Sequence, residues 1–414
     1  MNIVVVGSGP GGIAAAVTAS EQGAKVFLLD ENPRAGGQIW RHQDLQSVPY
    51  SARRWMQRLR SQSIEAHFGT TALGWNGTHV QGLRNESEFV QFPYDKIILA
   101  TGARELLLPF PGWTLPNVLG CGGAQALLKA GLPVKGKRVV VSGSGPLLLA
   151  VAAAFIKKGA KVVGIFEQAE MISLGRFGAR LALHPHKLWQ GLVYGWRCFP
   201  TLMKPGSWIQ QAEGDQALRS VTVTNGKREW KLECDLLACG YGLVPNTELA
   251  SSMGCKIDKD RIQTDREQKT SLTNIYCVGE GTGIGGEDVA LLEGQIAALS
   301  ALGRKEARIP MQTRLGWEPF QQDLDQCFRL RKEVLHLARH DTIVCRCEDI
   351  SFATIENFPD QRSAKLQTRC GMGPCQGRVC GAACKAIFGW EPNKSRTPLV
   401  PMQVDTYSRY LAGK

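Results

Sequence analysis

Apolar positions near the start of the chain fall in short continuous runs, separated by glycines and by an alanine-rich stretch. The run Val4–Val6 leads into the turn Gly7-Ser-Gly-Pro-Gly-Gly12, the alanine-rich stretch follows, and a second apolar run ends in Asp30-Glu31. Short apolar runs beside glycine turns are typical of buried strands, so this order predicts a strand, a turn, a helix and a second strand. A unit of this kind can hold the pyrophosphate of a dinucleotide at the amino end of its helix.

The same pattern returns later in the chain. Val4-Val-Val-Gly-Ser-Gly-Pro10 recurs as Val140-Val-Ser-Gly-Ser-Gly-Pro146, and Gly23-Ala-Lys-Val26 recurs in register as Gly159-Ala-Lys-Val162. The second copy also ends its strand in an acid, Glu167. We therefore predict an α/β protein that contains two Rossmann-like dinucleotide-binding domains.

Three glycines of the first turn each have a distinct physical role. Gly7 permits the tight turn, Gly9 lets the backbone approach the pyrophosphate, and Gly12 allows the helix to pack closely on the strand. A carboxylate at the end of the second strand, Asp30 or Glu31, can accept hydrogen bonds from ribose hydroxyls. These five residues are the first candidates for cofactor binding.

The second copy departs from this pattern at the start of its helix. It keeps Gly143 and Gly145, but it has Leu147 and Leu148 where the first copy has glycines. Bulky side chains crowd the contact between helix and strand, so we expect NAD(P)H to bind poorly there. A working nicotinamide site, a site for another nucleotide and a scaffold without a nucleotide all remain open.

Three later segments extend the dinucleotide-binding pattern. Asp95–Glu105 predicts a buried strand that enters a glycine turn, and Asp235–Asn246 is a second version of the same element. Asn274–Gly281 predicts another strand followed by an acid, and the alanine-rich stretch Val289–Leu302 predicts a helix beyond it. These segments are expected to supply donors and an acceptor for the rest of the cofactor.

The carboxyl-terminal part of the chain holds a cluster of cysteines. Cys345 and Cys347 are one residue apart, and Cys370, Cys375 and Cys380 follow with four residues between neighbours. Thiolates in such a pattern can supply the four sulfur ligands of a 2Fe-2S cluster. Five thiols compete for four places, and spacing alone does not choose between Cys370/Cys375 and Cys375/Cys380.

Other roles for these cysteines agree less well with the sequence. Structural zinc usually takes pairs two to four residues apart, and Cys345-x-Cys347 is tighter. We expect no signal peptide, and a reducing cytosol disfavours disulfides. Cys121, Cys239 and Cys277 lie in apolar or glycine-rich runs, where we expect buried thiols without a ligand role.

Composition and charge narrow the class of protein. With 414 residues, 43% of them hydrophobic, the chain can form two or three domains. No apolar run reaches the roughly 18 residues that a membrane span needs. The net charge of +12 permits contact with an acidic partner or a membrane surface, but no lysine-arginine block with interleaved aromatics indicates nucleic-acid binding. We expect a cytoplasmic protein that is at most peripheral to the inner membrane and does not bind nucleic acid.

Two short segments resemble those of a known superfamily. The segment Ala100, Thr101 and Gly102 and the segment around Gly279 and Glu280 are similar to segments of the two-dinucleotide-domain flavoproteins. The resemblance implies that these residues bind FAD, although the family usually has aspartate where this chain has Glu280. The chain has no Cys-x-x-Cys near the expected flavin face, which argues against a disulfide reductase.

The resemblance also implies the domain organisation. In the superfamily the FAD domain is split by an inserted nicotinamide domain, which gives residues 1–108 and 246–303 for the FAD-binding domain and 109–245 for the NAD(P)-type insert. Residues 304–340 contain a linker and a helix, and the linker itself runs from about Gly303 to Gly316. A small helical 2Fe-2S module at 341–389 follows. The tail spans 390–414.

Further motifs narrow the resemblance. Gly36-Gly-Gln-Ile-Trp40, the Ala100 to Glu105 segment, Gly283-Ile-Gly-Gly286 and Gly371–Cys380 together resemble the FAD-containing alpha subunit of heteromeric opine, D-hydroxyproline and related amine dehydrogenases. Hydrogen cyanide synthase has a similar subunit. In these relatives a bacterioferritin-associated-ferredoxin-like module follows the flavoprotein. The match implies FAD contacts at Gly37 and Gln38, and it implies the cluster ligands Cys345, Cys347, Cys375 and Cys380, with Cys370 as a near neighbour.

The resemblance implies a subunit that relays electrons through FAD and a 2Fe-2S cluster. Its expected partners are a catalytic FAD-containing beta subunit, which oxidises the amino acid or opine, and a small ferredoxin-like gamma subunit. No nucleophile motif and no cluster among the seven histidines indicates a catalytic residue in this chain. Two other hypotheses remain, a stand-alone NAD(P)H-dependent flavoprotein reductase and a non-enzymatic 2Fe-2S redox sensor or assembly partner.

Overall fold

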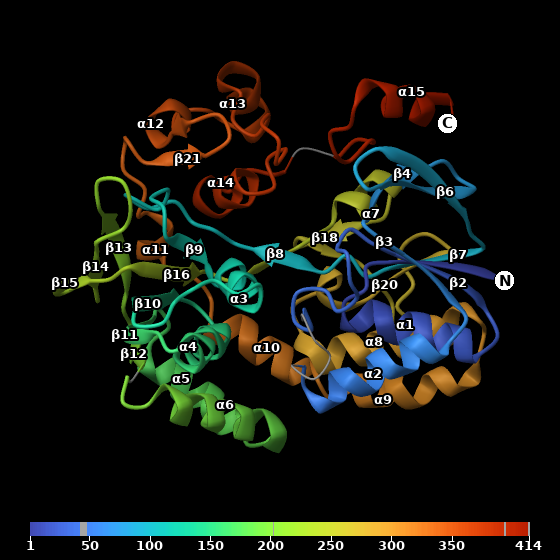
Figure 1. Cartoon of the computed structure of the whole chain (residues 1–414), viewed down its shortest axis with the longest axis horizontal. Helices are drawn as coiled ribbons and strands as arrows, with labels where there is room; N and C mark the ends of the chain where they lie inside the picture. The colour runs from blue at the N-terminus through green and yellow to red at the C-terminus, as the bar shows by residue number, and fades with distance from the viewer. Residues whose placement is uncertain (42–47, 202, 393–394, 413–414) are drawn as a thin grey trace. The chain divides into compact units, whose positions relative to one another are not determined.

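A computed structural model describes residues 1–41, 48–201, 203–392 and 395–412 of the chain. The chain forms two compact units. The first contains Met1–Arg104, Val244–Gln321 and Lys394–Lys414, and the second contains Glu105–Leu243 and Gln322–Asn393. Two short strands that form a two-stranded sheet, β8 (Ala103–Glu105) and β17 (Leu243–Pro245), lie where the chain passes from one unit to the other (Figure 1).

A five-stranded parallel sheet forms the centre of the first unit, with the strand order β20-β7-β1-β2-β3. Its strands are β1 (Asn2–Val6), β2 (Lys25–Asp30), β3 (Ile64–Phe68), β7 (Lys96–Leu99) and β20 (Ile275–Cys277). Ile3, Val4 and Val5 are fully buried, as expected for a parallel sheet that is covered on both faces. The apolar runs of the sequence therefore become the central strands.

Two helices, α1 (Pro10–Glu21) and α8 (Gly286–Ala301), pack against each other in this unit. Proline lacks an N–H and so suits the first turn of a helix, where α1 begins. A Cβ atom on Gly294 would lie 2.2 Å from the carbonyl oxygen of Gly11. The two glycines therefore let the helices approach at backbone distance.

The carboxyl-terminal tail folds onto a second sheet of the first unit. This antiparallel sheet contains β4 (Thr70–Trp75), β5 (His79–Arg84) and β6 (Glu88–Pro93), and the tail ends in α15 (Val404–Ala412). Tyr410 of α15 is fully buried and packs with Leu73 and Leu83, while Thr406 donates a hydrogen bond to the carbonyl of Ser87 over 2.9 Å. The sequence had predicted no structure for this tail.

The remaining elements of the first unit are short. They are α2 (Tyr50–Ser61), α7 (Glu248–Met253), β18 (Ile257–Asp258), β19 (Arg261–Ile262), the 3-10 turns η2 (Gly279–Gly281) and η3 (Lys305–Ala307), and α9 (Arg308–Leu315). The segment 303–316, expected as a linker, contains the helix α9. The helix α10 (Glu318–Cys327) follows and leads the chain into the second unit.

The second unit repeats the architecture of the first. Its parallel sheet has the order β12-β11-β10-β16-β9, formed by β9 (Val118–Gly120), β10 (Arg138–Gly143), β11 (Lys161–Glu167), β12 (Met203–Pro205) and β16 (Leu236–Gly240). The helix α4 (Leu147–Lys157) connects β10 to β11 as α1 connects β1 to β2, and α3 (Cys121–Lys129) packs against α4. The predicted α/β fold with two Rossmann-like cores is confirmed.

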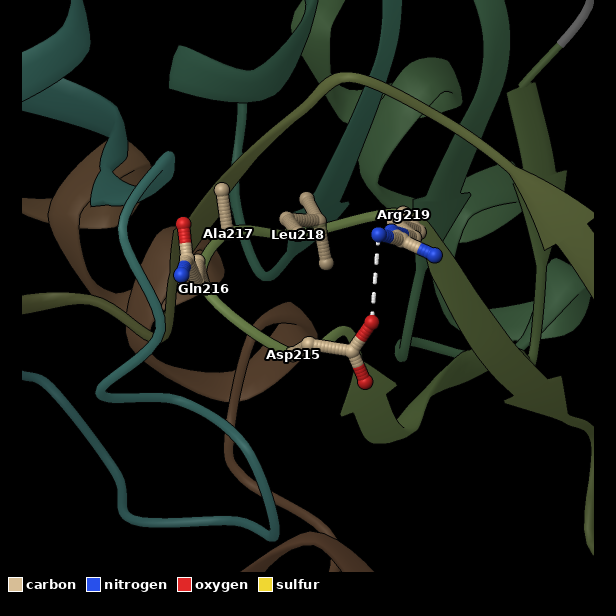
Figure 2. Close-up of a pocket in the computed structure, with 5 residues that line it drawn as sticks. All are labelled: Asp215, Gln216, Ala217, Leu218 and Arg219. Carbon is tan, nitrogen blue, oxygen red and sulfur yellow. Dashed lines mark ion pairs between the residues drawn. The ribbon is translucent and has the colours of Figure 1, made fainter.

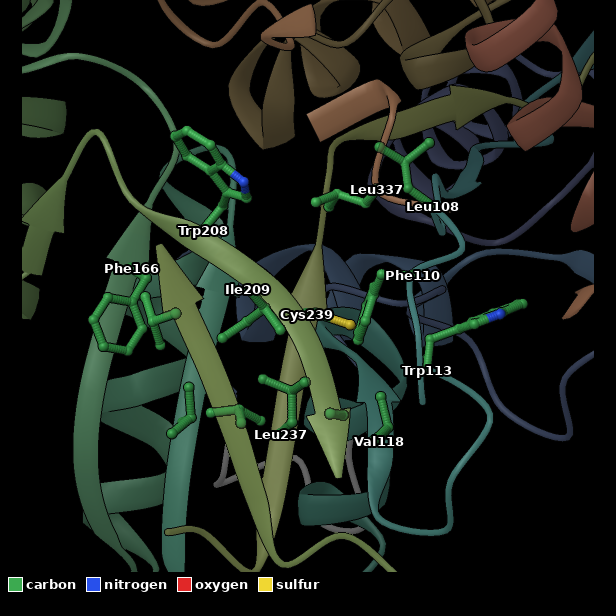
Figure 3. Packing of buried hydrophobic residues seen from close by; sticks show 14 of the residues in the cluster. Leu108, Phe110, Trp113, Val118, Phe166, Trp208, Ile209, Leu237, Cys239 and Leu337 are labelled. Atoms are coloured by element: carbon green, nitrogen blue, oxygen red, sulfur yellow. The ribbon is translucent and has the colours of Figure 1, made fainter. Parts of the chain in front are cut away.

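An antiparallel sheet completes this part of the second unit, together with an apolar core to which the carboxyl-terminal segment also contributes side chains. The sheet contains β13 (Trp208–Glu213), β14 (Ser220–Thr224) and β15 (Glu229–Glu233). Figure 3 shows Phe110, Phe166, Trp208 and Leu237 in the core, together with Leu337 from the carboxyl-terminal segment. The helices α5 (Met171–Leu181) and α6 (Pro185–Cys198) follow β11, and α6 packs on α4.

The cysteine-rich segment forms a small module of short elements. They are α11 (Lys332–Leu335), β21 (Ile343–Cys345), β22 (Ile350–Ser351), α12 (Phe352–Ile355), α13 (Gln361–Thr368) and α14 (Cys380–Phe388). Val344, Ile355 and Trp390 belong to its own buried cluster. The indole N–H of Trp113 donates to the carbonyl of Ile343 over 2.6 Å and so ties the module to the inserted domain.

Candidate functional site

The first glycine loop is closed on one side and open on the other. A Cβ atom on Gly7, where φ is +104°, would lie 2.2 Å from the carbonyl oxygen of Ala100, and a Cβ atom on Gly12 would lie 1.8 Å from the carbonyl oxygen of Gly7. Only glycine fits these two positions. A Cβ atom on Gly9 would meet nothing within 4 Å, so the backbone there is open to a ligand. The loop has the shape that a pyrophosphate cradle needs.

The two acids after β2 lie in different surroundings. Asp30 is buried, and one of its carboxylate oxygens accepts hydrogen bonds from the N–H and the hydroxyl of Ser8, both over 2.6 Å. The other oxygen accepts from the backbone and side-chain nitrogens of Asn32 over 2.8 Å. Glu31 is exposed. Asp30 therefore orders the glycine loop, and Glu31 presents the more accessible carboxylate.

The glycine pair after β2 lies against the same loop. The N–H of Gly36 donates to the carbonyl of Ser8 over 2.8 Å. A Cβ atom on Gly37, where φ is +56°, would lie 2.8 Å from the Cα atom of Gly9. Gln38 follows at an exposed position. The structure thus brings the predicted residues of both turns together.

The segment after β7 is held by residues that come much later in the chain. The hydroxyl of Thr101 donates to the carbonyl of Asn246 over 2.7 Å, and the side chain of Asn246 donates to the carbonyl of Thr101 over 2.9 Å. Arg104 forms an ion pair of 2.8 Å with Glu248. A Cβ atom on Gly102, where φ is +66°, would meet nothing within 4 Å. Asn246 was not among the predicted site residues, although it ends the second version of this element in the sequence.

The turn after β20 depends on a buried acid that sequence reasoning missed. Glu293 of α8 is fully buried, and its carboxylate accepts hydrogen bonds from the N–H of Gly279 over 2.8 Å and the hydroxyl of Thr282 over 3.0 Å. Arg314 pairs with the other oxygen over 2.8 Å. Burial raises the pKa of Glu293, and Arg314 opposes this shift. The signal in the sequence was a single acid in the middle of an alanine-rich helix.

Three adjacent strands place these turns at one edge of the sheet. The glycine loop follows β1, Ala100 follows β7, and Gly279 and Glu280 follow β20. The N–H of Val278 donates to the carbonyl of Leu99 over 2.9 Å, which aligns the last two turns. Glu280 is half-buried, and burial raises its pKa. The carboxyl edge of a parallel sheet is where dinucleotides bind in this class of fold.

In the second glycine loop the backbone still passes close to the neighbouring strand. The acid at the end of β11, however, binds backbone N–H groups of the protein itself. A Cβ atom on Gly143 would lie 1.8 Å from the carbonyl oxygen of Gly240. Glu167 is buried, and its two oxygens accept from the N–H groups of Gly145 over 2.7 Å and Ala169 over 2.9 Å. Burial raises the pKa of Glu167 to about 7. Leu148 is buried in the apolar core around α4.

A segment of the same chain lies on the second glycine loop. The hydroxyl of Ser144 donates to the carbonyl of Phe328 over 3.1 Å. The side chain of Gln168 donates to the carbonyl of Arg329 over 3.2 Å and accepts from the N–H of Arg331 over 3.0 Å. The guanidinium of Arg331 also stacks on Trp208 at 5.1 Å. The helical spacing of Phe320, Leu324, Cys327 and Val334 had predicted one amphipathic helix across this segment, but α10 ends at Cys327 and α11 begins at Lys332. The sequence gave no sign of the contact between this segment and the loop.

The cysteine module gathers its thiols around one cavity. The cavity measures about 210 Å³, and its walls contain all four predicted ligands, Cys345, Cys347, Cys375 and Cys380, together with Leu107, Arg346 and Val379. The sulfur atoms of Cys345, Cys370 and Cys380 also lie within 4.8 Å of one another. Thiol donation from Cys370 and Cys380 lowers the pKa of Cys345 to about 2. Such a group of sulfur donors suits an iron-sulfur cluster or zinc.

Glycines shape the loop that carries Cys375. A Cβ atom on Gly373 would lie 2.2 Å from the Cβ atom of Cys347, and a Cβ atom on Gly371, where φ is +84°, would lie 3.5 Å from the Cα atom of Gly377. The loop can therefore approach Cys347 only because residue 373 is glycine, while the positive φ of residue 371 favours glycine there. Its sequence, more than the cysteine spacing, brings Cys375 to the cavity.

The other cysteines and a second hollow show no such arrangement. Cys121, Cys239 and Cys277 are buried, which confirms the prediction of packed thiols, and all the cysteines of the chain are free. A hollow of about 550 Å³ is lined by the loop 215–219 alone and contains the exposed ion pair of Asp215 with Arg219, 3.1 Å apart (Figure 2). It contains none of the predicted site residues. Among the described helices, none combines the length and hydropathy required to cross a membrane.

Comparison with known proteins places this arrangement in a family. The model of the pyridine nucleotide-disulphide oxidoreductase family matches residues 1–300. Hydrogen cyanide synthase subunit HcnB of Pseudomonas protegens is 31% identical, over 98% of this chain and 97% of its own. One of the subunits of opine oxidase from Agrobacterium tumefaciens is 30% identical, over 98% of this chain and 88% of its own. Rhodocoxin reductase of Rhodococcus erythropolis is 29% identical over 68% of this chain and 64% of its own.

Solved structures share the fold. L-proline dehydrogenase from P. horikoshii matches with a TM-score of 0.70 and 19% identity, over 98% of this chain and 78% of its own. Thioredoxin reductase of T. acidophilum matches with a TM-score of 0.56 and 22% identity, over 73% of this chain and 97% of its own. With its paired Rossmann-like cores and its matches to subunits of hydrogen cyanide synthase and opine oxidase, the chain belongs to the pyridine nucleotide-disulphide oxidoreductase family and is a flavoprotein oxidoreductase.

Proposed function

We propose that this chain is the electron-transferring FAD and 2Fe-2S subunit of a heteromeric dehydrogenase that oxidises D-hydroxyproline, an opine or a similar amino acid. The main support is that one chain combines an open dinucleotide cradle with a cavity walled by four cysteines. The two relatives described above that match over nearly the full length are named as subunits of a synthase and of an oxidase. The proposed role is to take electrons from a catalytic partner and pass them on.

FAD fits the edge of the sheet in the first unit. The open backbone at Gly9 and Gly102 leaves room for the pyrophosphate and for the rest of the cofactor, and Glu31 offers an accessible acceptor for ribose. Bound flavin can accept two electrons and release them singly. Asp30 and the Glu293 network hold the loops in place around it, because their carboxylates bind backbone N–H groups.

A 2Fe-2S cluster fits the cavity of the cysteine module. We propose Cys345, Cys347, Cys375 and Cys380 as its ligands, because all four line the cavity, whereas Cys370 does not. A cluster with four thiolate ligands carries one electron at a time. Leu107 and Val379 add apolar side chains to the wall, and the apolar surroundings of a cluster are one means by which a protein sets its reduction potential.

Oxidation of the substrate is assigned to a partner. The sequence offers no recognisable acid-base set for an amine, so we propose a catalytic FAD-containing beta subunit and a small ferredoxin-like gamma subunit. We further propose a cytoplasmic location, at most peripheral to the inner membrane.

One alternative has a specific observation in its favour. The second loop retains Gly143 and Gly145, and relatives at lower coverage include rhodocoxin reductase, which suggests a stand-alone NAD(P)H-dependent reductase. Two observations argue against the reductase. The carboxylate of Glu167 already accepts a hydrogen bond from the backbone N–H of Gly145. The carbonyls of Phe328 and Arg329 accept hydrogen bonds from Ser144 of the loop and from Gln168. We therefore propose that NAD(P)H does not feed the flavin here. A redox sensor without flavin agrees poorly with the intact first cradle.

The first prediction concerns the cluster ligands. Replacing Cys345, Cys347, Cys375 or Cys380 with serine removes a thiolate, and we expect the iron content and the electron-paramagnetic signal to fall by at least about half. The Cys370→Ser variant is the matched control, since its sulfur lies near the cluster but outside the cavity wall, and its signal should be nearly unchanged. Loss of the signal in Cys370→Ser with retention in Cys380→Ser would move the site to the other pair.

The second prediction concerns reduction by nicotinamide nucleotides. We expect anaerobic NADH or NADPH to bleach the flavin more slowly than about 0.1 s⁻¹, at least tenfold below the low end of typical turnover rates. Stopped-flow absorbance measures the rate, and dithionite serves as the control that the flavin is reducible. Rapid bleaching that saturates with NADH concentration would favour the reductase instead.

The third prediction locates the catalytic step. The purified chain should oxidise D-hydroxyproline, opines or glycine with an artificial acceptor at least about 100-fold more slowly than the complex with a catalytic flavoprotein subunit. The reason is the absence of a recognisable substrate acid-base set in its sequence. Dye reduction by the chain alone and by the co-expressed complex provides the comparison. Equal rates for the two preparations would place the active site in this chain.

A further inference from the structure

The helices α5 and α6 of the second unit expose an unusual number of large apolar side chains. On α6 and just beyond it, Trp189, Leu192, Trp196 and Phe199 are 69%, 58%, 80% and 70% exposed. The whole set also includes residues at the start of α5 and between the helices, which are Met171, Ile172 and Leu183, at 66%, 66% and 78%. Soluble proteins rarely leave an apolar patch of this kind open to water. We call these seven residues the α5–α6 face.

The exposed residues share one side of α6. Trp189, Leu192 and Trp196 are spaced by three and four residues, so they line one stripe of the helix. Phe199 follows directly after the last residue of the helix, Cys198. The opposite side packs on the domain, because Cys198 is buried, donates its S–H to the carbonyl of Leu149 over 3.7 Å, and lies in the core around α4. Figure 1 shows α6 beyond α4 and α5 within this unit. The helix is thus held on one side and presents an apolar stripe on the other.

Basic residues predominate beside this face. No aspartate or glutamate occurs at residues 171–212, whereas arginine, lysine and histidine occur throughout. Arg176 and Arg197 are exposed, while Arg180 forms an ion pair with Asp323 of α10. Glu170, just before α5, pairs with Arg331 over 3.5 Å. A surface that is apolar in part and carries negative charge would therefore complement this face.

We propose that the α5–α6 face docks this subunit on the surface of an anionic phospholipid membrane. Tryptophan prefers the boundary between lipid tails and headgroups, and exposed arginine is attracted to anionic headgroups. An amphipathic helix with this division of residues lies in the plane of the membrane surface without crossing it. The inference rests on the peripheral location proposed above and is independent of the electron-transfer role.

Vesicle flotation of the full chain tests the proposal. The wild-type chain should float with vesicles of phosphatidylcholine and phosphatidylglycerol, bind pure phosphatidylcholine at least tenfold less, and lose binding as NaCl is raised. The double variant Trp189→Ser and Trp196→Ser should reduce binding to the anionic vesicles at least tenfold. The control variant Ile309→Ser and Leu366→Ser changes two apolar residues that are as exposed, at 71% and 68%, but lie elsewhere, and it should bind as the wild type does.

The outcomes separate this proposal from the electron-transfer role. Circular dichroism, the flavin spectrum and the cluster signal of the tryptophan variant should match the wild type, because the changed side chains are exposed. Failure of the wild type to bind anionic vesicles would overturn the membrane proposal and leave the proposed relay intact. A tryptophan variant that still binds vesicles but no longer assembles with the catalytic partner would also overturn it, since the face would then be a protein interface.

Discussion

The site in the first unit depends on the close approach of the glycine loop to the end of β7. A Cβ atom on Gly7 would overlap the carbonyl of Ala100, and one on Gly12 would overlap the carbonyl of Gly7. Any side chain at these positions would push α1 away from the sheet and with it the open backbone at Gly9. The contact between α1 and α8 needs the same closeness, through Gly11 and Gly294. The short distance between α1 and its neighbours therefore determines both the shape of the cradle and the packing of the two helices.

The second unit shows what happens when this constraint is only half retained. Gly143 still lies against the carbonyl of Gly240, so the tight turn survives. The helix that follows begins instead with Leu147 and Leu148, and Leu148 is buried in an apolar core. The polar groups near the loop bind other parts of the chain, as Ser144 does with Phe328. A duplicated nucleotide-binding unit can thus keep its fold while its polar groups serve the structure.

Local patterns predicted well what depends on local chemistry. The apolar runs, the glycine turns and the duplicated order predicted the strands β1, β2, β7 and β20 of the first sheet and β10, β11 and β16 of the second, because strand burial and turn conformation follow from neighbouring residues. The strands β3, β9 and β12, which complete the two sheets, were not predicted. The buried Glu293 with Arg314, the contact of Phe328 with the second loop, and the docking of Tyr410 on β4 and β5 were not predicted. Each joins residues that are distant in the sequence or stand outside any motif, and periodicity carries no information about such pairs.

The cysteines show the same division. Spacing indicated an iron-sulfur site but left five thiols for four places. The structure adds a cavity that four of them line, while the sulfur of Cys370 lies within 4.8 Å of those of Cys345 and Cys380 without lining that cavity. The most direct test of an electron relay is to mix the assembled complex with substrate under anaerobic conditions and follow the electron-paramagnetic signal of the cluster. We expect the reduced-cluster signal to appear within one turnover and to be absent when the catalytic partner is omitted. A complex that turns over while its cluster stays oxidised would contradict the account.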